Sequence, residues 1–159
     1  MAVFDALIDL DGNGRPLYGL LPFKVSKTMT LAGGTVNDPG DFDGTGNPAT
    51  LFTVTGDVQV MIVAVCKTTL VGATATIEVG VTGATASLLA ATTATDLVVN
   101  EGWNDATPTL AEARTPQIHI IGGGLDIKQT VGVANITAGV IDYYCFYRPL
   151  SSDGMIESA

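Results

Sequence analysis

The stretch from Thr50 to Lys67, TLFTVTGDVQVMIVAVCK, constrains the fold more than any other part of the chain. It is rich in Val, Ile, Thr and Phe, which favour strands, and it is interrupted only by Gly56-Asp57. Because side chains alternate along a strand, one face carries Val58, Val60, Ile62, Ala64 and Cys66. The other carries Gln59, Met61, Val63 and Val65, and it is nearly as apolar. We therefore expect a strand, divided by a bulge or bend at Gly56-Asp57, with one face on a core and the other against another sheet or another chain.

The composition favours a single domain whose surface is poor in charge. Of the 159 residues, 47% are hydrophobic and 14% are charged, against roughly 25% charged in typical soluble domains. The net charge of -9 argues against nucleic-acid binding, since phosphate neutralisation needs clustered Lys and Arg. We expect no secretory signal and no membrane span, because acids interrupt the N-terminal apolar residues. The chain is thus expected to be made in a cytoplasm and to have its surface covered by partners.

Further strand signals follow at short intervals along the chain. They lie at residues 23–31, 74–81, 117–121, 125–133 and 140–148, and residues 74–81 are expected to form a hairpin with the preceding strand. Residues 32–48 are dense in Gly, Asp, Asn and Pro and indicate a long loop. Residues 86–99 fit either a helical turn at 87–91 followed by a strand at 96–99, or strand throughout. About eight short strands with no βαβ units predict an all-β sandwich or barrel over residues 23–150, preceded by an arm at 1–22 and followed by a tail at 151–159.

The motifs that carry chemistry in other proteins are incomplete in this one. Asp9-Leu-Asp11-Gly-Asn13-Gly14 begins like a calcium loop, but Leu20 stands where a bidentate Glu is needed. Asp41, Asp43 and Thr45 repeat the alternation without completing it, so we expect turns and no metal. His119, the single histidine, is expected on the more polar side of its strand, and with no second histidine a cupin-like metal site is disfavoured. We expect no catalytic residue and no cofactor, a hairpin turn at Gly122–Gly124, and Cys66 and Cys145 as small buried hydrophobes.

Aromatic residues gather near the end of the chain. Tyr143, Tyr144, Phe146 and Tyr147 occupy both faces of the last predicted strand, and Trp103 lies in a polar connection. Aromatics of this kind serve as core or interface anchors, or as stacking platforms for sugars. We favour core plus interface.

Three segments resemble small all-β virion proteins of tailed bacteriophages: LFTVTGDVQVMIVAVCKTTL, ATIEVGVTGATASLLAATTATDL and AGVIDYYCFYRPL. The resemblance covers roughly residues 50 to 150 and concerns capsid decoration, or cement, proteins. It implies a jelly roll or related β-barrel with an N-terminal arm, a homotrimer, the major capsid protein as partner, and a place on the capsid surface of the virion. It brings no catalytic residues with it.

Candidate partner-binding residues are the apolar members of the arm and two aromatics of the predicted loops. They are Phe4, Leu7, Ile8, Leu10, Phe42 and Trp103. The alternative function is a jelly-roll carbohydrate- or receptor-binding head of a phage fibre or tail component, in which Trp103 and the tyrosines stack on sugars.

Overall fold

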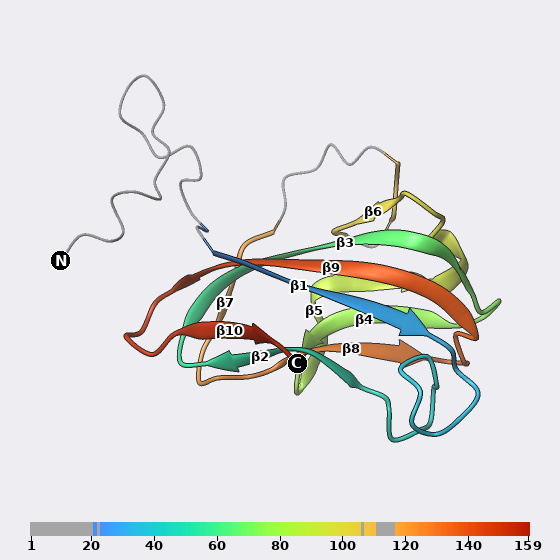
Figure 1. Ribbon diagram of the computed structural model, residues 1–159, viewed down its shortest axis with the longest axis horizontal. Helices are drawn as coiled ribbons and strands as arrows, with labels where there is room; N and C mark the ends of the chain where they lie inside the picture. The colour runs from blue at the N-terminus through green and yellow to red at the C-terminus, as the bar shows by residue number, and fades with distance from the viewer. Residues whose placement is uncertain (1–20, 22, 106, 111–116) are drawn as a thin grey trace.

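The protein is an all-β structure of two antiparallel sheets packed face to face (Figure 1). The computed structural model describes residues 21, 23–105, 107–110 and 117–159. The strands are β1 (Phe23–Leu31), β2 (Ala49–Thr55), β3 (Val58–Val71), β4 (Thr76–Val81), β5 (Ala84–Thr93), β6 (Gly102–Trp103), β7 (His119–Ile121), β8 (Ile127–Gly132), β9 (Ala138–Pro149) and β10 (Met155–Ser158). A short 3-10 helix, η1 (Ala94–Asp96), follows β5.

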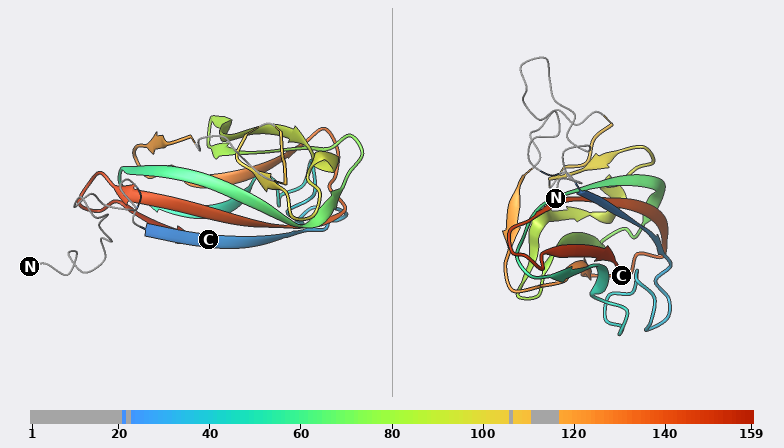
Figure 2. Two further views of the ribbon diagram at one scale, coloured as in Figure 1. Left: turned by 90° about the horizontal axis from the view of Figure 1, so that it is seen from above. Right: turned by 60° about the vertical axis from the view of Figure 1, so that its left-hand side comes forward.

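The strands pair in a nested order. β1 pairs with β9, β2 with β8, β3 with β6 and β7, and β4 with β5, always antiparallel. β9 also pairs with β3, β8 with β4, and β10 with β2. The first sheet therefore runs β1-β9-β3, with β6 and β7 both against β3, and the second runs β10-β2-β8-β4-β5. Figure 2 shows the two layers from above and from one side.

Gly56-Asp57 is the point at which the long apolar run changes sheets. β2 belongs to the second sheet and β3 to the first, so the predicted bend is a crossover between sheets. Gly56 has φ +63°, a value that costs glycine little and other residues more. A side chain there would also collide with Ser151 and Asp153. Glycine at this position lets one continuous apolar sequence supply inward-facing residues to both layers.

The core lies between the two sheets and is built from the inward face of each strand. Val58, Val60, Ile62, Ala64 and Cys66 are all buried, as their alternation predicts. Facing them from the second sheet are buried residues that include Phe52, Ile77, Val79, Ile127 and Val131. Burial of side chains of this size contributes roughly 1.5–3 kcal/mol each, which makes this layer the main source of stability.

One hydrogen-bonded chain crosses the core between the sheets. The Tyr143 hydroxyl of β9 donates to Gln129 Oε1 of β8 at 2.9 Å, and both residues are fully buried. Gln129 Nε2 in turn donates to the carbonyl oxygen of Pro39 at 3.2 Å. Burial raises the pKa of Tyr143 well above its usual value, so the hydroxyl keeps its proton. The chain links β9, β8 and the loop at 32–48 without leaving these groups unpaired.

Several sequence-based expectations about connections are wrong, and the cause is the same in each. β4 pairs with β5 and β8, and not with the preceding strand β3. Gly122–Gly124 join β7 of the first sheet to β8 of the second, so they form a crossover and not a hairpin. Residues 84–93 are strand and the short helix follows them, which reverses the helix-then-strand alternative for 86–99. Local patterns predict the strands but do not specify their partners.

The C-terminal residues belong to the second sheet and are not a tail. β10 pairs with β2 through Met155↔Thr55 to Ser158↔Phe52. Its Ile156 is buried in the core. Strand β10 is too short to stand out in the sequence, and its single inward residue carries little periodic signal.

Candidate functional site: the outer face of the first sheet

The two sheets differ sharply in the face that each turns away from the core. The second sheet presents mainly polar side chains there: Thr53, Thr55, Thr76, Glu78, Lys128 and Thr130. The first sheet presents apolar and aromatic ones from β3 and β9, each of them partly exposed. A polar outer face is what a sheet in contact with water requires, so the first sheet carries the unusual surface.

We define the outer stripe as Met61, Val63, Val65, Tyr144, Phe146 and Ile120. The register of β3 and β9 sets Met61 opposite Phe146 and Val63 opposite Tyr144. Ile120 of β7 lies opposite Gln59 and extends the stripe past the edge of β3, with 71% of its surface exposed. Cross-strand neighbours on one face approach closely, so these side chains form a continuous surface and not scattered exposed residues.

Strand β7 turns its apolar residues outward. Ile118 just before it and Ile120 within it are 40% and 71% exposed. His119 pairs with the inward residue Val60 and lies opposite to the face of Ile118 and Ile120, as expected, but this more polar side of the strand is the one that faces inward. Burial lowers the pKa of His119, which favours the neutral imidazole. A half-buried strand usually turns apolar side chains inward and polar ones outward. Here Ile118 and Ile120 are exposed and the histidine between them faces inward, which points to a partner on the outer side.

Charged residues border the stripe along β1 and at the end of β9. Lys24 Nζ lies 5.7 Å from the centre of the Tyr144 ring. Arg148, opposite Gln59, is exposed at the same end of the stripe. At the other end Asp142 accepts a hydrogen bond from the Thr28 hydroxyl at 2.5 Å. The stripe therefore has a basic end, close to where the chain enters β1. At the other end Asp142 is bonded to the neighbouring strand β1, and Lys67 is exposed on β3 just beyond Val65.

The residues that the sequence predicted to bind a partner lie in different environments. Trp103 is fully buried and its ring centre lies 6.5 Å from that of Tyr143, so its assignment to a binding surface is wrong. Phe42 is 43% exposed on the loop at 32–48. Phe4, Leu7, Ile8 and Leu10 lie outside the described residues. Because Trp103 lies in a polar connection, the sequence did not indicate that its side chain would be buried in the core.

The Asp-rich loop at 32–48 is held by its own turn bonds and by residues 131–136. Thr35 N–H donates to Asp38 Oδ2 at 3.1 Å, a turn bond of the predicted kind. Asn47 binds Val131 through both its Nδ2 and Oδ1, and Gly33 N–H donates to the carbonyl of Ile136. Within the described ranges, no group of three or more His, Cys, Asp or Glu side chains is placed to hold a metal ion.

Cys66 and Cys145 are buried free thiols on neighbouring strands. Cys145 lies opposite Ile62 and Cys66 opposite Ile141, so the two are out of register for a disulfide. Burial raises the pKa of the Cys66 thiol, and it raises that of Cys145 to about 12. Both thiols stay protonated near neutral pH and behave as small hydrophobes, as predicted.

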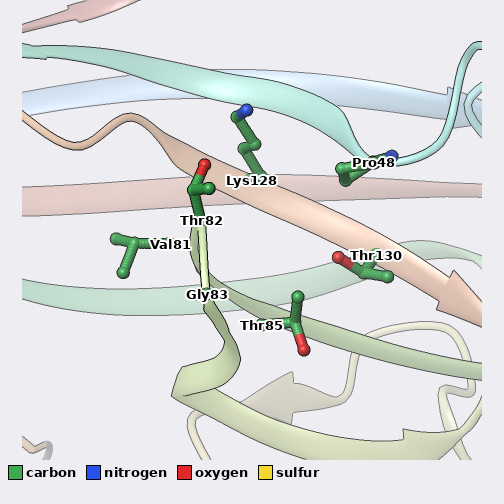
Figure 3. A pocket seen from close by; sticks show the side chains of 8 residues that line it. Pro48, Val81, Thr82, Gly83, Thr85, Lys128 and Thr130 are labelled. Carbon is green, nitrogen blue, oxygen red and sulfur yellow. The ribbon is translucent and has the colours of Figure 1, made fainter.

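A small pocket lies on the polar outer face of the second sheet, over β8 and the β4–β5 hairpin (Figure 3). Its volume is about 180 Å³, and its lining includes Thr82, Thr85, Lys128 and Thr130. Gly80 also lines it, and a side chain at this position would collide with the backbone at the start of β5. Its lining contains no aromatic ring, so it offers no platform on which a sugar would stack.

The sequence signal for the stripe was present in the double apolar face of residues 58–66 and in the aromatics on both faces of β9. The sequence did not indicate that Ile118 and Ile120 belong to this outer surface, because a half-buried strand normally turns isoleucine inward.

Comparisons with protein-family models, with curated proteins and with solved structures gave no match to this chain. Among the residues described, no helix is long and apolar enough to cross a membrane.

Proposed function

We propose that the chain is a non-enzymatic structural protein of a phage virion, a capsid decoration protein that binds the assembled head as a homotrimer and stabilises it. The observation that carries the proposal is the outer stripe, an apolar sheet face that stays partly exposed among the described residues of a single chain. Contiguous exposed apolar surface of this kind marks protein interaction sites. Its partners would be further copies of the chain and the major capsid protein, after synthesis in the host cytoplasm.

We further propose that the sandwich is a jelly roll. Support comes from the nested pairing of β1 with β9, β2 with β8, β3 with β6 and β7, and β4 with β5. An antiparallel ribbon rolled up in this way gives two four-stranded sheets, the arrangement of viral capsid and lectin domains. Here β10 adds one strand beside β2.

A carbohydrate-binding or receptor-binding head is the second candidate, and less supports it. Trp103 and Tyr143 are buried, so two of the aromatics expected to stack on sugars are unavailable. Tyr144 remains on the outer stripe, but Lys24 already lies over its ring.

Two measurements test the proposed function. Light scattering at micromolar concentration is expected to give the mass of a trimer, whereas a stable monomer would contradict the assembly. Sedimentation with empty expanded capsids of the encoding phage is expected to carry the protein down, and a glycan array is expected to show no binding. Glycan binding without capsid binding would favour the second candidate.

A further inference from the structure

We propose that the outer stripe of each copy is covered by residues 4–11 of a neighbouring copy. This docking rests on the oligomer proposed above. It would join two subunits through the outer stripe of one copy and residues 4–11 of another. The arm segment reads FDALIDLD, in which the even positions are all apolar and the odd positions are acids except for Leu7. The stripe is apolar, has a basic end and lies at the surface of the described chain.

The dimensions of the segment and of the stripe agree. From Gln59 to Val65 the strand rises about 20 Å at roughly 3.3 Å per residue. Residues 4–11 in extended form would cover about 26 Å. One extended segment can therefore lie along the whole stripe with Phe4, Ala6, Ile8 and Leu10 on the face toward it, while Leu7 shares the opposite face with the acids.

The charges are also complementary. Asp5, Asp9 and Asp11 belong to a chain with a net charge of -9, so most surfaces of another copy would repel them. Lys24 and Arg148 are both exposed at one end of the stripe. The outer face of the second sheet lacks a comparable apolar surface, because threonines dominate it. The stripe thus combines both features that the segment needs.

The residues between the segment and β1 favour a neighbour over the same copy. From the sequence we expect Pro16 and Pro22 to favour extended backbone at the residues before them. If residues 15–22 are extended, they would carry the turn expected at Asp11–Gly14 about 25 Å beyond the start of β1. A segment returning from there would reach only the near end of its own stripe, so covering a whole stripe would require the segment of a second copy.

Disulfide trapping between two full-length variants tests the docking. Ile8→Cys is mixed with Ser26→Cys, and in a second mixture with Val63→Cys. Ser26 is exposed on β1 opposite Tyr144, and Val63 lies on the stripe itself. The native Cys66 and Cys145 are buried and give little background. Thr53→Cys, exposed on the outer face of the second sheet, is the matched control.

We expect peptide mapping after mild oxidation to find disulfides between positions 8 and 26, or 8 and 63, of different chains, at least tenfold above the control at position 53. Adding Lys24→Glu and Arg148→Glu to the acceptor chain should lower this yield several-fold, with an unchanged circular-dichroism spectrum. In a further sample both cysteines are placed on one chain, and a link found only within that chain would overturn the assignment to a neighbour. No link at either acceptor would overturn the docking. A trimer seen without the link would refute the docking alone, whereas a monomer would refute the oligomer as well.

Discussion

At the scale of single residues, alternate positions of β3 have opposite roles. Ile62 is 3% exposed in the core, while Val63 beside it lies on the outer stripe. We expect Ile62→Asp to unfold the domain, because a buried carboxylate with no partner costs several kcal/mol, about 4 or more. Thr55→Asp, on an exposed polar face and opposite Met155, should change the free energy of unfolding by about 0.5 kcal/mol or less. Urea denaturation followed by circular dichroism measures both, and a folded Ile62→Asp would show that the inward face is not packed.

Val133 stands in an unfavourable backbone conformation at the surface. It has φ +69°, where a β-branched side chain is strained, and 64% of it is exposed. Val133→Gly should raise the free energy of unfolding by roughly 1 kcal/mol, because glycine relieves the strain and little burial is lost. Ala134→Gly, at the next residue, whose φ is not positive, should not stabilise. A loss of stability in Val133→Gly would mean that the valine side chain contributes more than its exposure suggests.

At the scale of elements, the sandwich is tied together where its crossovers meet. The backbone oxygen of Asp57 accepts from the N–H groups of Leu150 and Ser151, and its Oδ1 accepts from Gly123 N–H at 2.9 Å. The turns β2–β3, β7–β8 and β9–β10 therefore converge on one residue at the left-hand end in Figure 1. Asp57→Ala should cost about 1 kcal/mol by removing the side-chain acceptor, and Asp57→Asn, which keeps an acceptor oxygen, should cost less. Equal losses in urea denaturation would show that this hydrogen bond does not hold the crossovers.

Strand β10 provides a second test at this scale. Ile156 is its buried residue and is 2% exposed, whereas Glu157 beside it is exposed. Ile156→Ala should lower the free energy of unfolding by about 2–4 kcal/mol, the usual cost of truncating a buried isoleucine. Glu157→Ala should be nearly neutral. If the two variants melt alike, the C-terminal residues do not belong to the core.

At the scale of the whole molecule, folding and assembly are expected to be separable. The core cluster of described residues runs from Met29 to Ile156, and β1 begins at Phe23. Deleting residues 1–16 should therefore preserve the circular-dichroism spectrum and cooperative unfolding. The same deletion should weaken the oligomer in light scattering and the attachment to capsids, because the apolar arm residues gain order from a partner. Loss of folding would place the arm in the core, and an unchanged oligomer would place the subunit contacts elsewhere.

The sequence by itself determined the all-β class, the inward residues of β3, and the buried state of Cys66 and Cys145. It could do so because side-chain alternation is a local property with a period of two residues. Only the tertiary structure decided that Gly56-Asp57 and Gly122–Gly124 change sheets, that Trp103 is buried, that β10 joins the second sheet, and that Ile118 and Ile120 face outward. Those outcomes depend on which strands meet across long stretches of chain, and the periodicity of a strand does not specify its partner.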